Sequence, residues 1–465
     1  MKEIFDPHVV LNPGKKINCD GFRTWRSNLR YGAKYHFNEG TNLLNWGPGK
    51  LQEIVESCNG CGQCRNTLGD VDMCPAFRAT GIEMATTRSK ANILRAYLTK
   101  QFEYEHLSEV KKVVDYCLNC KMCSIDCPSN VRAGDLMLEL KARIKNSHGK
   151  NKLIDQFLQN IEGFLRLGGK ISMISNQASS LGFIHKMMCK VLGLNSEKAF
   201  PKLSQNSWVK KNISKDDADI LNAQVLYYVD MYADLIDHKF ANLIFNFFKD
   251  NNYRCAIVDQ RSCGVVPLTY GNVDVAKKFA NFNIESFYPL LDGKKTIVCS
   301  EPTAALMIKD EYKLLANDLD KCSVVGENTM ELMGFLVKEI EKGRLKLPKI
   351  NFNEKIKVAY HRPCHLKALY ECDKSIPTPT QKLFKLLPMI EFYALPSGCC
   401  GMAGSFGMKE ENRLISDFLA SDVKMAIQNS NPDYIVTECS SCKMQLQSIL
   451  PNASVLHPLQ LLMEK

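Results

Sequence analysis

Apolar positions in the first half of the chain recur at helical intervals. Residues 87–101 read TRSKANILRAYLTKQ and residues 109–118 read EVKKVVDYCL, and in both the apolar residues lie three and four positions apart. This spacing is typical of amphipathic helices. The region 151–220 continues the pattern, with glycines that interrupt it, in IDQFLQNIEGFLRLGGKISMI and LGFIHKMMCKVLGL. We expect these segments to form connecting helices.

After about residue 221 the pattern changes to short β-branched and aromatic runs that alternate with helical stretches, as in parallel α/β units. This region also repeats itself. VLYYVDMYADL at 225–235 aligns with VAYHRPCHLKA at 358–368, SCG at 262–264 aligns with CCG at 399–401, and Cys299 aligns with Cys439. A duplicated module explains the similar spacing of the matched segments.

These patterns predict an α+β multidomain protein. The C-x2-C-x2-C motifs at 58–64 and 117–123 are typical of ferredoxins, so we expect an α-helical two-cluster ferredoxin domain followed by a duplicated parallel-sheet α/β domain. The expected divisions are an N-terminal extension at 1–50, the ferredoxin domain at 51–150, connecting helices at 151–220, a first α/β half at 221–350 and a second half at 351–465.

Composition narrows the location and the kind of partner. The chain has 465 residues with 45% hydrophobic content, and it contains neither a long apolar run nor a signal-peptide pattern. We therefore expect it in the cytoplasm. Its net charge of +10 is spread along the chain without a basic tract, which argues against nucleic acid and favours an anionic membrane surface or an acidic partner.

The cysteines indicate metal binding, because a cytoplasmic chain with 20 cysteines is not expected to form disulfides. Two motifs stand out: Cys58, Cys61 and Cys64 followed by Cys74-Pro75, and Cys117, Cys120 and Cys123 followed by Cys127-Pro128. The second is the full C-x2-C-x2-C-x3-C-P run of ferredoxins. Zinc knuckles are the alternative, but zinc sites place their ligands in two spaced pairs.

In two-cluster ferredoxins the fourth cysteine of each motif binds the other cluster. We therefore predict two crossed ligand sets for 4Fe-4S clusters. Cluster 1 takes Cys58, Cys61, Cys64 and Cys127, and cluster 2 takes Cys117, Cys120, Cys123 and Cys74. Nine residues separate Cys64 from Cys74 instead of three, so Cys74 departs from the usual spacing. Nearby, Arg88, Lys90 and Arg95 either add positive potential to the clusters or form a solvated helix face.

The second α/β half carries further cysteines just after predicted strands, in KIKVAYHRPC, IEFYALPSGCC and DYIVTECSSC. Ligands of open parallel sheets gather at the carboxyl ends of the strands. The strand ends would therefore bring together five thiols: Cys364, Cys399, Cys400, Cys439 and Cys442. Five thiolates exceed what one zinc ion or one cubane cluster needs, which favours a larger or irregular cluster.

This spacing, together with the two ferredoxin motifs, resembles the cysteine-rich (CCG) domain proteins. That group includes heterodisulfide reductase subunits, the glycolate oxidase iron-sulfur subunit and a subunit of anaerobic glycerol-3-phosphate dehydrogenase. The resemblance implies that the five cysteines of the second half bind a third, noncubane 4Fe-4S cluster or a related iron-sulfur site.

The first half has a poorer donor set. The aligned positions hold Met231, Ser262, Cys263, Cys299 and Pro302, so we expect this half to be structural. In the second half, His361, His365 and His457 either tune the cluster by hydrogen bonds or are ordinary core or surface residues.

In the connecting region, Cys189 within FIHKMMCKVLGL is expected to be a small core residue. The basic amphipathic helix that contains it either packs between domains or docks on a membrane.

Neither a dinucleotide nor a triphosphate motif occurs in the sequence. The resemblance implies an oxidoreductase: the iron-sulfur electron-transfer subunit of a flavin-dependent dehydrogenase. Its substrate would be a 2-hydroxy acid (D-lactate, glycolate or 2-hydroxyglutarate) or glycerol 3-phosphate. Electrons would pass from FAD on a partner subunit toward quinone or another carrier, with peripheral association on the inner face of the cell membrane. The alternative is a thiol-disulfide reductase like heterodisulfide reductase, with the CCG-site cluster as its catalytic centre.

The N-terminal stretch EIFDPHVVLNPGKKI resembles the closing segment of FAD-linked oxidase domains, which precedes the iron-sulfur extension in fused members of that family. A disordered tail is the simpler interpretation of so short a segment. The resemblance implies instead that residues 1–18 contact a separate FAD subunit and help to place its flavin near the Cys58 or Cys117 motif.

Overall fold

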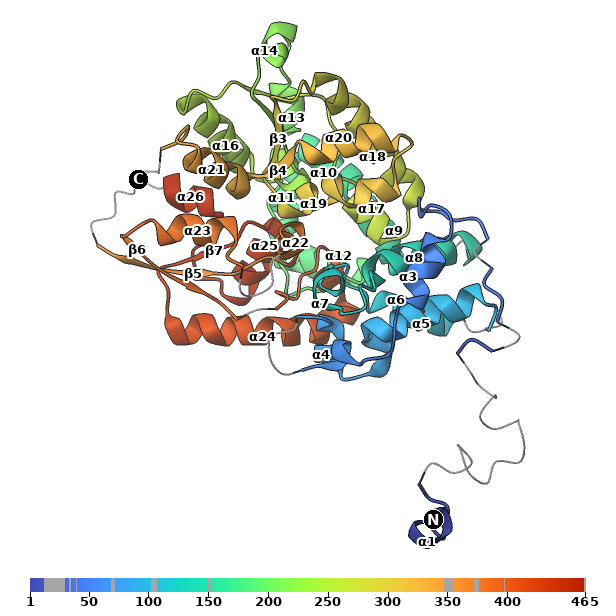
Figure 1. The fold of residues 1–465 in the computed structure, drawn as a ribbon. Helices are drawn as coiled ribbons and strands as arrows, with labels where there is room; N and C mark the ends of the chain where they lie inside the picture. The colour runs from blue at the N-terminus through green and yellow to red at the C-terminus, as the bar shows by residue number, and fades with distance from the viewer. Residues whose placement is uncertain are drawn as a thin grey trace.

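The computed structural model describes residues 1–11, 30–32, 35–38, 40–67, 72–101, 107–148, 153–346, 354–371, 376–396 and 398–463. Figure 1 shows a helical region within residues 50–148, connecting helices within residues 153–221, and two α/β units whose elements lie within residues 225–341 and 356–463. Helix α1 (Lys2–Phe5) lies apart from them. The predicted fold class, an α+β multidomain protein with a helical ferredoxin-type region and parallel sheets, is confirmed.

The helical region surrounds both ferredoxin-type motifs. Its elements are α3 (Lys50–Glu56), η1 (Gln63–Arg65), α4 (Pro75–Thr80), η2 (Glu83–Ala85), α5 (Thr87–Leu98), α6 (Leu107–Asp115), α7 (Cys123–Asp126) and α8 (Ala133–His148). The Thr86 side chain caps α5 by accepting a hydrogen bond from the Ser89 amide. Leu51, Leu94 and Leu136 are fully buried and belong to one apolar cluster, which holds α3, α5 and α8 together. Both helices predicted here, α5 and α6, are confirmed.

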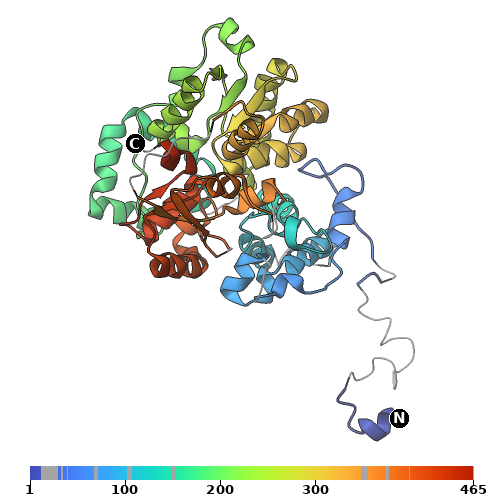
Figure 2. The same cartoon turned by 60° about the vertical axis from the view of Figure 1, so that its left-hand side comes forward.

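The connecting region is helical, as its apolar spacing predicts. It contains α9 (Leu153–Gln159), α10 (Ile161–Lys170), α11 (Ser172–Ser180), α12 (Gly182–Leu192), α13 (Trp208–Asn212) and α14 (Asp217–Leu221). Helix α12 ends at Gly193, whose φ of 69° is the left-handed conformation that glycine adopts without strain. Helices α10–α12 lie at one edge of the molecule in Figure 2.

Two four-stranded parallel sheets form the α/β units. The first has the order β2-β1-β3-β4, from β1 (Val225–Tyr228), β2 (Cys255–Ala256), β3 (Thr296–Cys299) and β4 (Thr329–Glu331). The second has the order β6-β5-β7-β8, from β5 (Ile356–Tyr360), β6 (Ile390–Ala394), β7 (Tyr434–Val436) and β8 (Val455–Leu456). The matching strand order supports a duplicated module.

Helices cover both sheets. Those of the first unit are α15 (Met231–Leu235), α16 (His238–Asp250), α17 (Val265–Thr269), α18 (Val273–Phe287), η4 (Tyr288–Leu290), α19 (Pro302–Lys309), η5 (Glu311–Leu314), α20 (Leu319–Glu327) and α21 (Leu332–Glu341). Those of the second are α22 (Cys364–Leu369), α23 (Pro379–Lys385), η6 (Phe406–Met408), η7 (Glu410–Asn412), α24 (Arg413–Ser430), α25 (Ser440–Ile449) and α26 (Pro458–Met463). One apolar cluster contains residues of both sheets, including Tyr227 and Tyr360, so the units share a core.

Strand register corrects part of the sequence repeat. Val298 pairs with Tyr227, and Val436 pairs with Tyr360, so these two pairs are equivalent. Glu301 lies three residues after Val298, and Cys439 lies three residues after Val436, so Glu301 is the equivalent of Cys439. The helix caps agree, since Glu301 is the N-cap of α19 and Cys439 is the N-cap of α25. The predicted match of Cys299 with Cys439 is therefore wrong by two residues.

The reason for the misalignment is local. Cys299 is the last residue of β3 and is fully buried within the sheet, whereas Cys439 lies beyond the end of β7. By the same register, Ala304 and not Pro302 is equivalent to Cys442. The match of SCG with CCG agrees with the backbone, because Gly264 and Gly401 both have positive φ, 83° and 90°.

Candidate metal centres

The first cysteine loop joins α3 to η1. Gly60 and Gly62 have φ values of 77° and 80°, which turn the backbone between the three cysteines. Cys58 and Cys64 are buried and Cys61 is exposed. The amide of Arg88 donates to Cys64 Sγ at 3.4 Å. Amide donors of this kind tune cluster potentials in iron-sulfur proteins.

The second cysteine loop joins α6 to α7. Asn119 and Lys121, on either side of Cys120, both have left-handed φ values, 52° and 63°. This pair of turns folds the loop tightly around Cys120. The amide of Gly134 donates to Cys123 Sγ at 3.4 Å, from the start of α8. Burial raises the pKa of the Cys123 thiol to about 12, with the neighbouring Cys117 as the next cause.

Cys74 lies beside the second loop despite its long separation from Cys64. Asp126 Oδ2 accepts hydrogen bonds from the amides of Asp72 and Met73, each at 2.9 Å, and this fixes the approach to Cys74. One small cavity is lined by four thiols: Cys74, Cys117, Cys120 and Cys123. This is the ligand set predicted for cluster 2, and its four sulfur donors around one space suit a cubane.

Cys127 lies between two apolar clusters. It packs against the apolar cluster that contains Cys58 and also against the one that contains Cys64. Its inclusion with Cys58, Cys61 and Cys64 in cluster 1 stays a prediction.

A buried lysine accompanies the second loop. Lys90 is 2% exposed, and its Nζ donates to Cys74 Sγ at 3.3 Å and to the Ala85 carbonyl at 2.8 Å. Burial opposes its charge, but the Cys74 and Cys117 thiolates outweigh that effect and raise the pKa of Lys90 above its ordinary value. The interpretation of Lys90 as part of a solvated helix face is therefore wrong.

The predicted strand ends of the second unit are confirmed. Cys364 begins α22 just after β5, Cys399 and Cys400 follow β6, and Cys439 and Cys442 follow β7 at the start of α25. Gly401 completes the CCG turn, and a Cβ there would lie 2.2 Å from the Ser416 carbonyl oxygen, so only glycine fits.

The five thiols interact with one another. Hydrogen bonds from Cys399 and Cys442 hold the pKa of Cys400 well below its usual range. The same contacts raise the pKa values of Cys399 and Cys442. Burial raises the pKa of Cys364 to about 12, and the charges of Cys439 and Cys400 add to that effect. The group thus readily provides a thiolate at Cys400, and a metal would allow the others to ionise.

The equivalent end of the first unit is poor in donors. By strand register and by the glycine turn, its matching residues are Met231, Ser262, Cys263, Glu301 and Ala304, which include a single thiol. This set is weaker than the one expected from sequence, because Cys299 is absent from it. The structural role expected for this half stays a prediction, now with a stronger basis.

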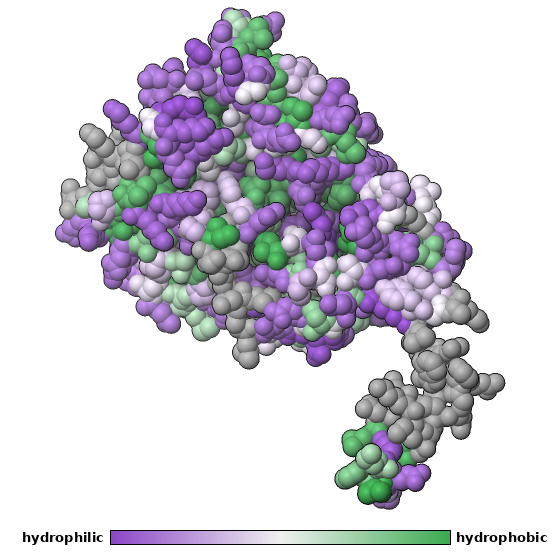
Figure 3. Space-filling model, viewed as in Figure 1, coloured by the Kyte–Doolittle hydropathy of each residue, from purple (hydrophilic) through white to green (hydrophobic). Residues whose placement is uncertain are grey.

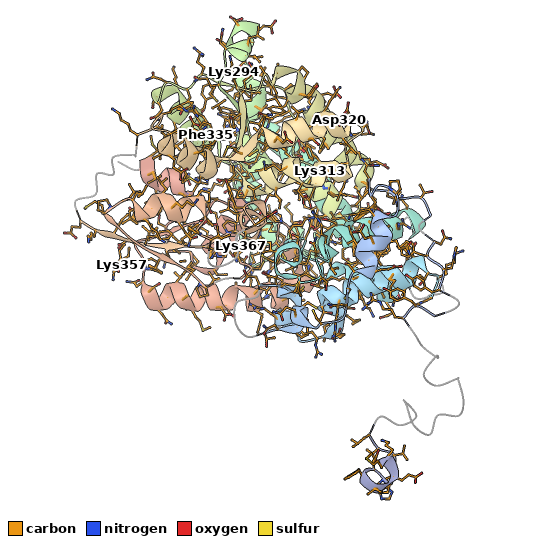
Figure 4. The ribbon with its side chains drawn as sticks, in the orientation of Figure 1. Lys294, Lys313, Asp320, Phe335, Lys357 and Lys367 are labelled. Atoms are coloured by element: carbon orange, nitrogen blue, oxygen red, sulfur yellow. The ribbon has the colours of Figure 1, made fainter. Side chains whose placement is uncertain are left out.

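The ferredoxin-type region and the CCG cysteines meet directly. His365, next to Cys364, bonds through Nε2 to the carbonyl of Asn119 at 2.9 Å, and Asn119 is next to Cys120. After burial, the charge of Cys364 is the main cause that raises the pKa of Cys120. Lys367, labelled near the centre of Figure 4, forms a buried 2.7 Å ion pair through its Nζ with Asp72.

A cavity of about 580 Å³ adjoins the CCG cysteines. At one end it is lined by all five thiols. The connecting helices add apolar walls, which include Phe157, Phe164, Leu165 and Met188. The ferredoxin-type region and the first α/β unit complete the lining and contribute charged residues, among them Lys141 and Glu301. Phe164 and Met188 are also exposed on the molecular surface. The cavity therefore links the surface of α10 and α12 to the cysteine site.

Sequence reasoning underestimated the role of two residues at these sites. Lys90 is one, because its burial depends on the tertiary packing of α5. His361 is the other: a ring nitrogen of His361 and the Sγ atoms of Cys400 and Cys442 all lie within 4.8 Å of one another. Its position three residues before Cys364 is the only sequence signal for this role. Cys189 is buried, as expected.

Comparison with known families identifies both regions. Residues 53–131 match the family described as a 4Fe-4S dicluster domain, and residues 358–447 match the family described as a cysteine-rich domain. The predicted resemblance to CCG-domain iron-sulfur proteins is confirmed.

Several characterised proteins are similar over most of the chain. A subunit of the anaerobic glycerol-3-phosphate dehydrogenase of Escherichia coli (strain K12) is 25% identical over 340 residues, which cover 72% of this chain and 82% of that protein. The glycolate oxidase iron-sulfur subunit of the same strain is 22% identical, over 86% of this chain and 91% of that one. D-2-hydroxyglutarate dehydrogenase of the same strain is 20% identical over the whole of this chain, which spans 48% of its length. The predicted class, an oxidoreductase, is confirmed.

Proposed function

We propose that this chain is the electron-transfer subunit of a flavin-dependent dehydrogenase that oxidises a 2-hydroxy acid or glycerol 3-phosphate. The observation that carries the proposal is the contact between the Cys120 loop and the Cys364 helix through Asn119 and His365. It brings the ferredoxin-type cysteines next to the CCG cysteines, as an electron path requires. The similar subunits of glycerol-3-phosphate dehydrogenase and glycolate oxidase support it.

The chain's cysteines would hold three iron-sulfur clusters. Cys58, Cys61, Cys64 and Cys127 would hold cluster 1, Cys74, Cys117, Cys120 and Cys123 would hold cluster 2, and the five CCG cysteines would hold the third. Such clusters supply one-electron transfer, whereas oxidation of an alcohol group removes two electrons, so FAD on a partner subunit is the expected intermediary. Lys90 balances the negative charge of the Cys74 site, and the amides of Arg88 and Gly134 donate to cysteine sulfurs.

The N-terminal segment is the proposed contact with the FAD subunit. Ile4, Phe5, Val10 and Leu11 are all largely exposed, and Asp6 organises the segment by accepting hydrogen bonds from the amides of Val10 and Leu11 at 2.8 Å. An exposed apolar segment of this kind gains stability by packing on a partner. Of the 18 residues in the proposed contact, residues 12–18 lie outside the described part of the chain.

The proposed electron acceptor is a lipophilic quinone in the cavity beside the CCG cysteines. The apolar lining of the cavity suits a hydrophobic molecule, and its walls include helices that carry exposed apolar residues. We propose that α10–α12 rest on the inner face of the cell membrane, from which a quinone could enter. The face of the molecule seen in Figure 3 is mostly hydrophilic by contrast. None of the described helices is long and apolar enough to span a membrane.

The test begins with the chain purified anaerobically. About 12 irons per chain are expected, and about 8 would remove the third cluster from the proposal. The chain is then mixed with FAD-containing dehydrogenase subunits, each with its own substrate: glycerol 3-phosphate, glycolate, D-lactate or D-2-hydroxyglutarate. One pair should bleach the cluster absorbance when substrate is added and should then reduce a soluble quinone. If no dehydrogenase subunit reduces the clusters and the chain instead reduces a disulfide, the result would favour the thiol-disulfide reductase.

A further inference from the structure

His361 occupies a fixed position at the edge of the second sheet. It follows β5 directly, and its backbone amide donates to the carbonyl of Val436, in β7, at 3.0 Å. The residue therefore sits at the carboxyl ends of two neighbouring strands, where Cys364 and Cys439 also emerge. Its backbone is held by the sheet ladder, which limits how far the ring can move.

The His361 ring points at the thiols. The residue is only 1% exposed, and one of its ring nitrogens lies within 4.8 Å of both Cys400 Sγ and Cys442 Sγ, which are themselves that close to each other. An imidazole nitrogen beside thiolates is a common metal-ligand combination.

The other two histidines of this unit are engaged differently. His365 is bonded at both ring nitrogens, to Thr303 Oγ1 and to the Asn119 carbonyl, each at 2.9 Å. His457 accepts a hydrogen bond from the Leu459 amide and packs on the Phe240 ring, with centroids 4.7 Å apart. Only His361, among these three, belongs to the group whose atoms are close enough to share one metal ion.

The duplicated unit provides an internal comparison. Strand register makes Tyr228 the equivalent of His361, because Tyr227 and Tyr360 are equivalent. Tyr228 donates its hydroxyl proton to the carbonyl of Arg261 at 2.8 Å and so faces a backbone partner. The imidazole thus occurs in the half that has five thiols, and a tyrosine stands there in the half that has one.

We propose that His361 is a nitrogen ligand of the metal centre formed by the CCG cysteines, so that this centre has mixed sulfur and nitrogen ligation. The inference rests on the proposed function in that it takes the centre to be an iron-sulfur cluster. A neutral imidazole adds a ligand without the negative charge that a further thiolate would bring, and in other clusters histidine ligation raises the reduction potential. His361 would accordingly make the third cluster a better electron acceptor for cluster 2.

The first experiment uses the unaltered protein. The full chain is produced with natural-abundance nitrogen and, separately, with histidine labelled with ¹⁵N, and pulsed EPR is recorded on the third cluster in its paramagnetic state. A strong nitrogen coupling that changes from the ¹⁴N to the ¹⁵N pattern on histidine labelling is expected. Backbone amides near the sulfurs also couple, including that of His365, so the ¹⁵N label is confined to the imidazole ring and leaves every backbone signal unchanged. A third cluster without any histidine coupling would overturn the inference and leave the proposed function intact.

The second experiment identifies the residue. His361→Cys and His361→Leu should both lose the histidine coupling, while the signals of clusters 1 and 2 persist as evidence of folding. His361→Cys should also lower the reduction potential of the third cluster. The matched control is His457→Asn, which should keep the coupling. Retention of the coupling in both His361 variants would overturn the assignment, and finding zinc or no third metal centre in the unaltered chain would overturn both the inference and the third cluster.

Discussion

Buried charges around the cysteines are the residue-scale feature that most affects redox chemistry. Lys90 donates to Cys74 Sγ from inside the core, so its ammonium lies beside the proposed cluster 2. A nearby positive charge stabilises the reduced, more negative form of a cluster. Lys90→Gln should therefore lower the potential of cluster 2. A lost interaction of about 1.4 kcal/mol corresponds to about 59 mV for one electron.

Potentiometric titration followed by EPR measures this shift. Lys112→Gln is the matched control, because Lys112 pairs with Glu109 on the exposed face of α6. That variant should leave the potential of cluster 2 unchanged. An equal shift in the two variants would show that Lys90 acts only through the net charge of the protein.

Glu331 gives a pH-dependent prediction. Burial, and next the charge of the nearby Glu438, raise its pKa to about 8. The folded state binds the Glu331 proton more tightly than the unfolded state does. The contribution of Glu331 to folding stability is therefore fully present below about pH 4.5 and is lost as the pH rises through about 8. Glu331→Gln, which mimics the protonated acid, should change stability little at pH 5. At pH 8.5 it should raise the free energy of unfolding by about 4 kcal/mol.

Denaturant unfolding at the two pH values measures the effect. Glu109→Gln, on the exposed face of α6, should show no such pH dependence. A Glu331→Gln protein that loses as much stability between pH 5 and pH 8.5 as the unaltered protein would contradict the assignment.

At the residue scale, the sequence predicts which cysteines lie close together wherever their spacing along the chain is short. The C-x2-C-x2-C loops and the CCG turn bring their own cysteines together, since only a few residues separate them. The burial of Lys90 and the direction of the His361 ring depend on contacts between distant segments, namely α5 with the Cys74 loop and β5 with β7. Local pattern holds no information about such contacts.

Helices α10–α12 carry many exposed apolar side chains. These are Phe164, Leu167, Ile171, Met173, Ile174, Leu181, Phe183, Met187, Met188 and Val191. Exposed lysines accompany them at 170, 186 and 190, and the only acidic residue of the three helices is Glu162. Apolar and basic side chains together are typical of helices that lie in a membrane interface.

Membrane binding can be tested by charge substitution on this surface. The double variant Phe183→Glu and Val191→Glu should reduce co-sedimentation with anionic lipid vesicles at least tenfold, because each carboxylate would have to enter the interface. Leu414→Glu is the control, since Leu414 is 83% exposed on α24, outside the α10–α12 segment. Undiminished vesicle binding by the double variant would show that another surface makes the contact.

Element types were more predictable than element register. The apolar spacing located α5, α6 and the connecting helices, and the β-branched runs located β5, β6 and β7. The repeat was misaligned at its third segment because Cys299 and Cys439 are the same residue type. The sequence alignment matched the two cysteines to each other although their positions in the repeat differ by two residues. The pairing of β3 with β1 reveals that difference.

At the scale of the whole molecule, polar contacts hold the three parts together around the cysteines. Lys121, buried in the Cys120 loop, forms ion pairs with Asp135 of the helical region and with Glu311 of the first unit. Asp72, before Cys74, pairs with Lys367 of the second unit. Each contact lies within a few residues of a cysteine, so the joints between the parts also fix the relative positions of the proposed clusters.

The Asp72–Lys367 pair allows this coupling to be tested. Both side chains are buried, and removal of one partner from a buried ion pair typically costs about 3–5 kcal/mol. Lys367→Met should therefore loosen the Cys74 loop from the second unit and slow electron transfer from cluster 2 to the third cluster. The measurement is the rate at which the third cluster is reduced after rapid mixing with a reduced flavin partner.

The double variant Asp72→Asn with Lys367→Met separates the ion pair from the fold. It removes both charges, so it should recover most of the stability that Lys367→Met loses. The transfer rate should recover with it if the charge left at Asp72 is what displaces the loop. Stability that returns while the transfer rate stays low would show that the Lys367 side chain itself lies on the electron path. A single variant with unchanged stability and rate would contradict the view that this joint positions the clusters.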